Sequence, residues 1–303
     1  MTLHSLSSIL NNAIKGNYAV GYFESWDSYS FEAILETAEE EQSPIIMGFG
    51  ATMLEDNWLN KNGIEFLAAS GRALLKDAKV PVAFLLNETH TLEQAIRGVE
   101  AGFNTVMIDS HRWEVDKAKK EVKALVDIAH KNNVQVEAEF GSLPDYLGGE
   151  IVDAKSYMTD PAEAKKFVEE TGIDCLAVAI GNVHLLTKGS ANIDIQRLKE
   201  IRSQVSLPIA IHGGTGFPDN QIKEAIANGV AKFNVGTRLK TDFLKSVKEY
   251  VTSLDENCFV HDIVGSHKKS DFLEVGKDSI KVNKYQNRLE NWLKLLFSFL
   301  QPN

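Results

Sequence analysis

Two histidines stand where packing alone does not require an imidazole. His212 ends the apolar run LPIAIH, and His184 comes shortly after the run CLAVAIG. Glu139 lies near the end of a third run, VQVEAEFG, which also carries Glu137 on the same face of a strand. Neutral imidazoles with a carboxylate and an open position are typical of catalytic divalent-metal sites. A single strand-end histidine is more often a hydrogen-bonded structural residue, so the metal prediction depends on these groups converging.

Other apolar runs also end in polar residues that can hold a metal or act on a substrate. They are Glu24, Asn87, Glu88, Asp109 and Asn234. In a parallel barrel, catalytic residues come from the carboxyl ends of several strands. The sequence therefore predicts one polar site to which many strands contribute.

Two glycine-containing loops indicate a place for an anion. HGGTG (212–216) precedes a helix expected from about Pro218, and NVGT (234–237) precedes the next helix. Backbone N–H groups in such turns and at helix N-termini bind anions, and barrels usually hold phosphate after strands seven and eight. Glycine also simply permits tight turns, which would explain one such loop. Two adjacent loops in these positions favour phosphate.

The elements that position these residues follow from apolar runs that alternate with helical patterns. The runs occupy residues 19–25, 43–50, 80–88, 105–110, 134–141, 175–181, 207–214 and 232–237. Helices are expected at 28–40, 57–75, 91–101, 114–131, 161–171, 194–204 and 218–228, and from about 238. Strands that are apolar on both faces indicate a parallel sheet covered by helices. Eight such units predict an α/β fold, a (β/α)8 TIM barrel, rather than an open doubly wound sheet.

We expect a single domain over residues 1–303, with the barrel at about 18–252 and a helical extension at about 253–303. Residues 285–301 have helical apolar spacing, and their apolar face is expected to pack on the core or on another subunit. The segment PDYLGGEIVD, which holds Glu150, belongs to a loop that is long for a barrel. This loop is interpreted as a possible cover for the site, with a solvated loop as the alternative.

Composition and charge argue against several classes of partner. The net charge is −10, with 44% hydrophobic and 24% charged residues, so neither nucleic acid nor a membrane surface is expected as a partner. Lysines from Lys268 to Lys284 are interpreted as a solvated face, with contact to an anionic substrate as the alternative. Two cysteines do not make a disulfide framework. The sequence has no signal-peptide pattern and no apolar stretch of ~20 residues, so a cytoplasmic location is expected.

Six motifs stand out once these elements are in place. They are MIDSH, VEAEFG, YMTDPAEAKKFVEETGIDCLAVAIG, AIGNVH, IAIHGGTGFPD and KFNVGTRLK. From about Tyr18 to Tyr250, their order and spacing resemble the class II, metal-dependent fructose-bisphosphate and tagatose-bisphosphate aldolases. The resemblance implies a TIM barrel, a homodimer or homotetramer, and zinc or a similar divalent ion. It also implies reversible aldol cleavage of a phosphorylated ketose into dihydroxyacetone phosphate and an aldehyde.

The resemblance implies roles for individual residues. His184 and His212 match two metal ligands, and Asp109 and Glu139 match acids that hold the metal in an alternative position. The positions expected to bind the phosphate and hydroxyl groups of the three-carbon unit are Gly181, Gly213, Gly214, Thr215, Asn234, Gly236 and Thr237.

The clearest departure from the family lies at the end of the third strand. The family has His-Leu-Asp-His there, in which Asp shuttles a proton and the last His binds the metal, whereas this chain has LLNE (85–88). Asn87 takes the catalytic position, but an amide is not basic near neutral pH. Glu88 can complete a two-histidine, one-carboxylate set with His184 and His212, although its charge weakens the ion as an electrophile.

These departures predict an altered substrate or proton donor. GFGATM and FESWDSYS replace family segments that contact the distal part of the sugar, and Leu185 stands where a glycine usually follows the metal histidine. Glu24, Asp109 and Glu150 are the candidates for the missing base. The preferred hypothesis is an aldolase-like lyase that acts through a metal-stabilised enediolate. The alternatives are an isomerase or epimerase on the same metal frame and a non-catalytic binding or accessory subunit.

Overall fold

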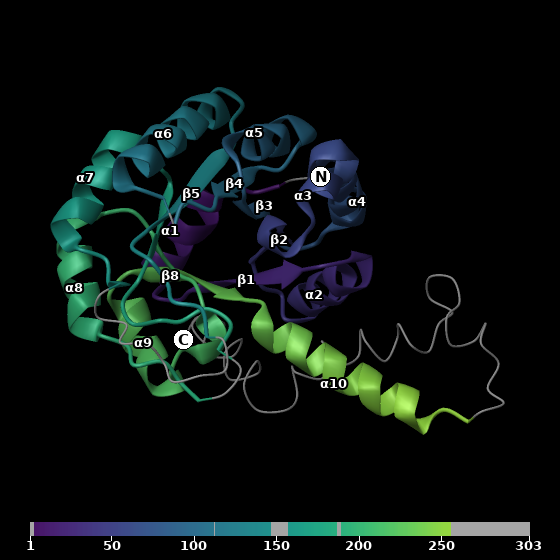
Figure 1. The fold of residues 1–303 in the computed structure, drawn as a ribbon. Helices are drawn as coiled ribbons and strands as arrows, with labels where there is room; N and C mark the ends of the chain where they lie inside the picture. The colour runs from purple at the N-terminus through teal and green to yellow at the C-terminus, as the bar shows by residue number, and fades with distance from the viewer. Residues whose placement is uncertain (1–2, 112, 147–156, 187–188, 256–303) are drawn as a thin grey trace.

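Eight parallel strands close into a barrel in the computed structural model, which describes residues 3–111, 113–146, 157–186 and 189–255 (Figure 1). The strands are β1 (Val20–Ser25), β2 (Ile45–Gly50), β3 (Val82–Thr89), β4 (Thr105–Ile108), β5 (Gln135–Phe140), β6 (Cys175–Val178), β7 (Ile209–Ile211) and β8 (Val230–Val235). Each strand pairs with the next, and β8 pairs with β1. The predicted TIM barrel is confirmed.

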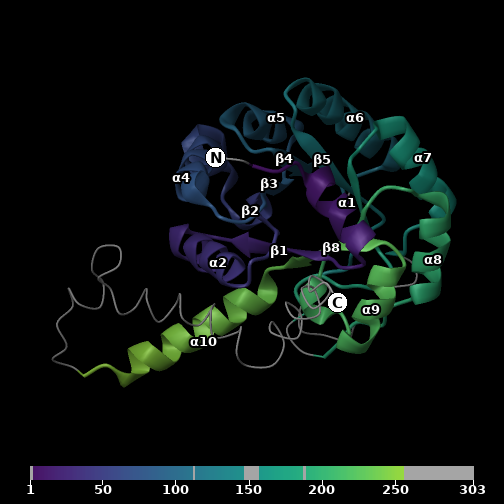
Figure 2. The same ribbon diagram turned by 180° about the vertical axis from the view of Figure 1, so that it is seen from behind.

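Helices form a ring outside the strands (Figures 1 and 2). They include α2 (Ser28–Glu40), α4 (Ile64–Leu74), α5 (Leu92–Ala101), α6 (Val115–Lys131), α7 (Pro161–Thr171), α8 (Ile195–Gln204), α9 (Asp219–Ala227) and α10 (Thr237–Ser253). The helix expected at 57–75 is divided, because the short α3 (Asp56–Trp58) and a π-helical turn at Leu59–Gly63 precede α4. The other bounds agree with the predicted ones to within a few residues.

Polar side chains fix where helices begin. Asp160 accepts hydrogen bonds from the N–H groups of Ala162 and Glu163, and Pro161 takes the first helical position of α7. At α2, Asp27 and Ser30 form a reciprocal capping box. These contacts satisfy N–H groups that have no partner inside the helix. The Asp-Pro signal in the sequence therefore marks the start of α7 correctly.

The main core lies between the barrel and the helix ring. Phe31 of α2 stacks on Phe49 of β2 at 5.3 Å, and Phe84 of β3 stacks on Phe103 at 4.3 Å. These rings are almost fully buried. Burial of each such side chain contributes about 1.5–3 kcal/mol. The outward faces of the strands thus hold the helices in place and leave the carboxyl ends free to form a site.

A helix that the sequence analysis does not predict, α1 (Leu6–Gly16), covers the amino end of the barrel (Figure 2). Its buried face consists of Leu6, Ile9, Leu10 and Ala13, which is regular helical spacing. These side chains share a second hydrophobic cluster with barrel-interior residues of the strands. The barrel is therefore closed at one end by apolar packing.

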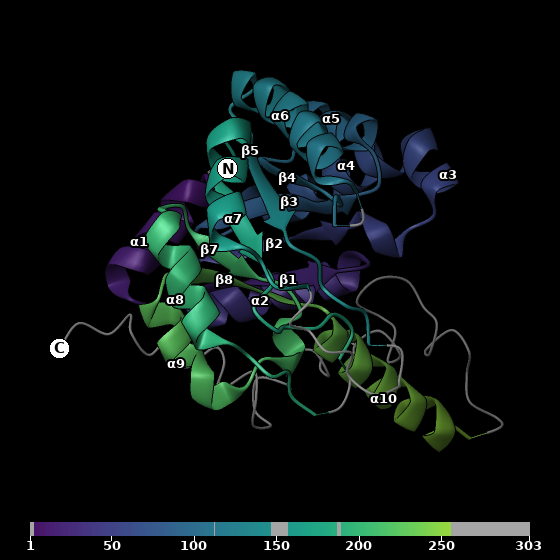
Figure 3. The ribbon, with the colours of Figure 1, turned by 60° about the vertical axis from the view of Figure 1, so that its left-hand side comes forward.

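The last described helix projects away from the barrel. α10 extends beyond the ring of helices in Figure 3, and Leu239 is its buried residue. The helix predicted at 285–301 lies outside the described residues. Within the described part of the chain, no helix is both long and apolar enough to cross a membrane.

Candidate active site

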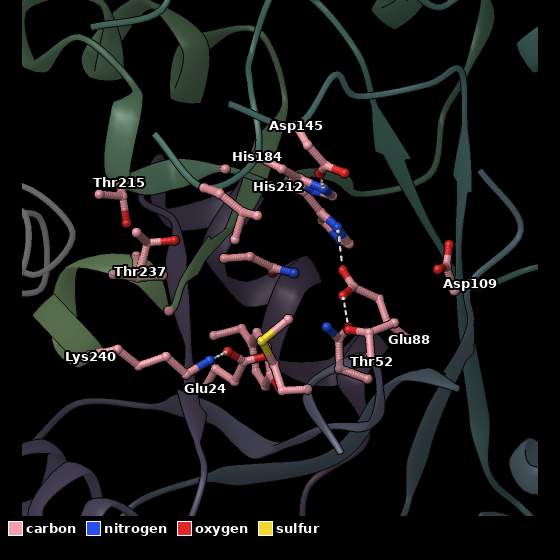
Figure 4. A pocket seen from close by; sticks show the side chains of 18 of the residues that line it. Glu24, Thr52, Glu88, Asp109, Asp145, His184, His212, Thr215, Thr237 and Lys240 are labelled. Carbon is pink, nitrogen blue, oxygen red and sulfur yellow. Dashed lines mark hydrogen bonds and ion pairs between the residues drawn. The ribbon is translucent and has the colours of Figure 1, made fainter. Parts of the chain in front are cut away.

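A pocket of about 520 Å³ opens at the carboxyl ends of the strands. Its lining includes the strand-end residues Glu24, Asn87, Glu88, Asp109, Glu139, His184, His212 and Asn234. Figure 4 shows the Glu88 carboxylate directed toward His212, with His184 beside it. The fold therefore brings together side chains that are far apart in the sequence.

Glu88, His184 and His212 form a candidate metal centre. Each offers one ligand atom, and these atoms lie within 4.8 Å of one another. The rings of His184 and His212 are stacked, with centroids 6.0 Å apart, and Glu88 Oε1 is 3.1 Å from His212 Nδ1. Glu139 Oε2 lies 3.4 Å from the same nitrogen. Two carboxylates thus face one imidazole nitrogen.

Buried atoms of this centre lack the partners that a protein interior normally supplies. His212 Nδ1 and Glu139 Oε1 have no hydrogen-bond partner among the described residues, although Glu88 Oε1 lies 3.1 Å from that nitrogen. An unsatisfied buried polar atom costs about 1–3 kcal/mol and requires an explanation. Two imidazoles and a carboxylate are donors that a divalent ion binds. The residues present therefore fit a divalent cation.

The charges of the centre also favour a cation between the carboxylates. Burial opposes protonation of His212, but the carboxylates of Glu137, Glu88 and Glu139 outweigh burial and raise its pKa to about 10. Burial also opposes ionisation of Glu88, but His212 and His184 outweigh it and lower the pKa of Glu88. Burial, the largest effect on Glu139, raises the pKa of that carboxyl. A positive charge at this point, from a proton or a metal ion, stabilises the ionised carboxylates.

A β-bulge in β3 aims Glu88 into the pocket. The register with β4 shifts between Leu86 and Thr89, and Glu88 has a left-handed backbone with φ of 53°. Thr52 Oγ1 donates a hydrogen bond to Glu88 Oε2 at 3.2 Å. Asn87 is buried beside it, and its Oδ1 has no hydrogen-bond partner in the described part. Left-handed conformations are unfavourable for residues other than glycine, and at Glu88 this conformation coincides with the bulge and with a position that lines the pocket.

The predicted proton-transfer residues lie at different places. Asp109 follows β4 and pairs with His111, a residue that the sequence analysis does not single out. Glu24 pairs with Lys240 of α10, and burial raises the pKa of Glu24 despite that lysine. Glu150 lies outside the described residues. The structure thus places Asp109 and Glu24, each with a charged or titratable partner, in the pocket lining.

His184 has a second contact that sequence reasoning missed. Asp145 Oδ1 lies 3.7 Å from His184 Nδ1, and the backbone N–H of Tyr146 donates to the carbonyl of His184. Burial disfavours the protonated form of His184, but Asp145 and Glu88 outweigh burial and raise its pKa. Asp145 is a loop acid without a periodic pattern around it, so the sequence gives no signal for this contact.

The loops after β7 and β8 lie together at one side of the pocket, where phosphate is expected. Figure 4 shows Thr215 and Thr237 on this side, and the N–H of Arg238 donates to Thr215 Oγ1 at 3.2 Å. Gly213 and Gly236 also line the pocket. Gly213 has φ of 65°, and a Cβ there would lie 2.2 Å from a backbone oxygen, so only glycine fits.

Other predicted positions pack behind these loops. A Cβ at Gly181 would lie 2.1 Å from the carbonyl oxygen of Asn192, and one at Gly214 would lie 2.6 Å from that of Asn234. Both glycines therefore allow backbone segments to approach closely. Leu185, which stands where the family usually has glycine, has a left-handed φ of 57°. This conformation costs a residue with a side chain about 1–2 kcal/mol.

The closed parallel barrel with two histidines and a carboxylate at its carboxyl end defines a (β/α)8 enzyme with a candidate divalent-metal centre. The chain belongs to the class-II fructose-bisphosphate aldolase family, because it matches the family model "Fructose-bisphosphate aldolase class-II" over residues 4–298. Members of this family are carbon–carbon lyases that generally depend on a divalent metal. The family predicted from the sequence motifs is confirmed.

Curated relatives carry the same family name. The chain is 37% identical over 251 residues to a probable fructose-bisphosphate aldolase of Bacillus subtilis (strain 168), with 82% of this chain and 86% of that protein covered. It is 35% identical over 264 residues to a fructose-bisphosphate aldolase of Geobacillus stearothermophilus, with 86% and 89% covered. These matches span most of both chains, so the likeness is to whole proteins.

Solved structures share the barrel. The YdjI aldolase from Escherichia coli K12 matches with a TM-score of 0.75 and 26% identity, over 98% of this chain and 97% of that chain. A putative fructose-1,6-biphosphate aldolase from Coccidioides immitis matches with a TM-score of 0.76 and 21% identity, over 97% and 98%. The second likeness, at its lower identity, supports the fold alone.

Proposed function

We propose that this aldolase cleaves a phosphorylated ketose or related sugar at a zinc ion held by Glu88, His184 and His212, with Glu139 as a further ligand. The observation that carries the proposal is their convergence, with buried unpartnered atoms, beside two glycine-containing loops. When bound, the ion polarises the substrate carbonyl and stabilises the negative charge that bond cleavage leaves on its oxygen. Zinc is favoured because it accepts imidazole and carboxylate ligands and keeps an open position in catalytic sites.

The loops after β7 and β8 are proposed to bind the phosphate of the three-carbon unit. The hydroxyls of Thr215 and Thr237 and the amino end of α10, which begins at Thr237, support this assignment. Gly213 and Gly236 leave the backbone accessible, while Gly181 and Gly214 are proposed to set the shape of the loops. The buried amide oxygen of Asn234, which has no hydrogen-bond partner among the described residues, also supports this assignment.

Asp109 is the proposed replacement for the proton-shuttling aspartate of the family. It lines the pocket and pairs with His111, so a proton released to the carboxylate has a neighbouring acceptor. Glu24 is a weaker candidate because Lys240 neutralises it. Asn87 is proposed to contact the substrate through hydrogen bonds, and Glu150 remains a proposed loop acid.

The aldehyde half of the substrate is proposed to differ from that of fructose bisphosphate. Thr52 and Met53, from the segment GFGATM that replaces a family segment in contact with the distal part of the sugar, line the pocket, and Thr52 donates a hydrogen bond to Glu88. The pair Asn87 and Glu88 changes both the proton chemistry and the charge next to the cleaved bond. A non-standard aldehyde fits these changes better than the family substrate does.

Metal analysis tests the centre directly. We expect the purified protein to bind zinc and the His212→Ala variant to lose it. His130→Ala is a matched control, because His130 pairs with Asp174 at the other end of the barrel at 2.9 Å. Equal zinc content in the parent and in His212→Ala would remove the centre as proposed.

Solvent deuterium exchange tests the reaction without knowledge of the aldehyde. Exchange into dihydroxyacetone phosphate, together with cleavage of one member of a panel of ketose phosphates, supports the aldolase proposal. Exchange without any cleavage would favour a sugar-phosphate isomerase or epimerase, for which the buried amide of Asn87 is the motivating observation. Absence of both would favour a non-catalytic subunit.

We also propose a single domain, a cytoplasmic location and a homodimer or homotetramer. The free, buried thiol of Cys175 supports the location, because thiols stay reduced in the cytosol. Leu244 and Val251 of α10, which are 65% and 49% exposed, support a contact between subunits. Size-exclusion chromatography with light scattering would measure the molar mass of the protein in solution, and a monomeric mass would contradict the proposed homodimer or homotetramer.

A further inference from the structure

A buried lysine–glutamate pair lies in the barrel interior beside the candidate metal centre. Lys232 comes from β8 and Glu137 from β5, and both side chains are 0% exposed. Lys232 Nζ is 2.7 Å from each carboxylate oxygen of Glu137 and 5.0 Å from the centre of the Tyr22 ring. Among the described residues, the pocket lining includes neither member of the pair. The pair therefore has no direct access to a substrate.

The pair is connected to the pocket through one metal ligand. Glu137 Oε1 is 2.9 Å from His212 Nε2, and a carboxylate can only accept a hydrogen bond. Nε2 therefore carries a proton. In a neutral imidazole the other nitrogen is then the acceptor, and in His212 that nitrogen, Nδ1, faces Glu88 and Glu139.

Stability alone does not account for charges at this depth. The barrel-interior residues around the pair, such as Met107, Cys175 and Ala210, are apolar and fully or almost fully buried. Apolar residues of similar volume often replace a buried ion pair with no loss of stability, or with a gain. Removal of one partner alone is strongly destabilising, because it leaves an unpaired charge. A functional contact explains why both charges are present here.

We infer that Glu137 and Lys232 are positioning residues for the metal centre: Lys232 holds the Glu137 carboxylate, and Glu137 accepts a hydrogen bond from the protonated Nε2 of His212 so that the unprotonated Nδ1 is available to the metal. This inference rests on the proposed metal centre. Hydrogen bonds of this kind orient metal-binding histidines and fix their tautomer. Glu137 and Lys232 therefore have a role at the metal centre although neither touches the substrate.

The test compares zinc affinity, measured by competition with a chelator, in the parent and in the double variant Glu137→Leu/Lys232→Met, in which residue 137 can no longer accept the hydrogen bond from His212 Nε2. The double change removes both charges together and leaves no unpaired one. We expect zinc affinity to fall by about 10–100-fold while circular dichroism shows a folded barrel. Cys175→Ala is the matched control, because Cys175 pairs with Glu137 in register and is buried, and its zinc affinity is expected to equal that of the parent.

Two results would overturn the inference in distinguishable ways. A folded double variant with the zinc affinity of the parent would show that the pair is only structural, while the metal centre itself stands. A parent protein that binds no zinc would remove the metal centre, and the inference with it.

If the double variant does not fold, NMR on the unmodified protein tests which nitrogen of His212 binds the metal. In protein with nitrogen-labelled histidine and a spin-active cadmium isotope bound, we expect NMR to show metal coupling at His212 Nδ1 and a proton on Nε2. Metal coupling at Nε2 would overturn the inference, because that nitrogen could not then donate to Glu137.

Discussion

At the amino ends of the strands, polar groups that are partly buried have hydrogen-bond partners. Asp174 accepts hydrogen bonds from the backbone N–H of Val136 at 2.8 Å, from Gln135 Nε2 at 3.1 Å and from His130 Nε2 at 2.9 Å. Gln135 also accepts from the backbone N–H of Ser7 in α1 at 2.7 Å. At the carboxyl ends, by contrast, several buried groups have no such partners.

The unpartnered groups are concentrated on the pocket side. Within the described part of the chain, the buried side-chain atoms without a hydrogen bond belong to residues in the middle of the strands or at their carboxyl ends: Tyr22, Ser25, Asn87, Ser110, Glu139, His212, Asn234 and also Glu137, whose Oε2 has only its ion pair with Lys232. Left-handed backbone does not distinguish the ends, because Asn17, Gln42 and Asn133 adopt it before β1, β2 and β5, as Glu88 and Leu185 do on the pocket side. One end of the barrel is thus satisfied without a ligand, and the other is not.

The groups that stabilise the barrel thus lie at one end, and the groups proposed to bind the metal and the substrate lie at the other. The amino end satisfies its polar groups and buries the apolar face of α1. The carboxyl end keeps unmade hydrogen bonds where a ligand can supply the missing partners. Substitutions at the two ends should therefore change different measurable properties, stability at one end and metal binding or turnover at the other.

The largest expected effect comes from Asn87→Asp at the carboxyl end. Restoring a carboxylate at the position of the family's proton shuttle should raise kcat/KM for fructose- or tagatose-bisphosphate cleavage by about 10²–10⁴-fold. The same change at Asn234, on another strand end, is expected to give no gain. If the metal-loaded Asn87→Asp protein cleaves these substrates no faster than the parent, position 87 alone does not account for the altered activity.

A large effect of the opposite kind is expected from Leu10→Ala at the amino end. Leu10 is fully buried in the cluster that closes the barrel, so its truncation should lower the free energy of unfolding by about 2–5 kcal/mol. Urea unfolding measures this loss, and Ile14→Ala, at a partly buried position of the same helix, should lose less. The two ends would not be independent if the folded Leu10→Ala protein also lost zinc affinity.

Glu88→Gln should lower zinc affinity by about 100-fold, because it removes the charge of one of the four proposed ligands. Asp174→Asn makes the same chemical change at the amino end, where three donors converge on the carboxylate. That variant should lose about 1–3 kcal/mol of stability and keep its zinc affinity. Isothermal titration with zinc measures the affinity of both variants, and urea unfolding measures their stability. Loss of zinc affinity in Asp174→Asn, without such a loss in Glu88→Gln, would refute the contrast between the two ends.

The smallest expected effect comes from Leu185→Gly. Relief of the left-handed strain, offset by the greater freedom of glycine in the unfolded chain, should stabilise the protein by about 0.5–1 kcal/mol. Leu185→Ala removes the same exposed side chain but keeps the strained backbone, so it should give no gain. Thermal unfolding of the two variants side by side measures the difference, and equal melting temperatures would argue against strain at this turn.

Most of the barrel could be predicted because its strands are apolar on both faces and its helices carry clear end signals. Asp160 before Pro161 is one such signal, and the structure has α7 begin there. The helix α1 was not predicted although Leu6, Ile9 and Leu10 have helical spacing. The division of the helix at 57–75 could not be foreseen, because a π-helical turn leaves no distinct pattern in the sequence.

The site was predictable where a residue ends a strand and unpredictable where a contact crosses the barrel. Glu88 and His212 stand out because a polar residue ends an apolar run. His111 carried a readable signal, since it follows Asp109 by two residues. Lys232 did not, because its partner Glu137 is 95 residues away and only the closed register of the strands brings them together.

The position of α1 has a consequence for synthesis of the protein. Leu6 and Leu10 are made early, yet they share their cluster with Ala231 of β8, the last strand of the barrel. During translation, the apolar face of α1 therefore leaves the ribosome long before the residues that cover it. Exposed apolar surface of this kind promotes aggregation of nascent chains. The cluster is complete only once Ala231 of β8 has been made, so chains truncated before β8 should depend most on chaperones.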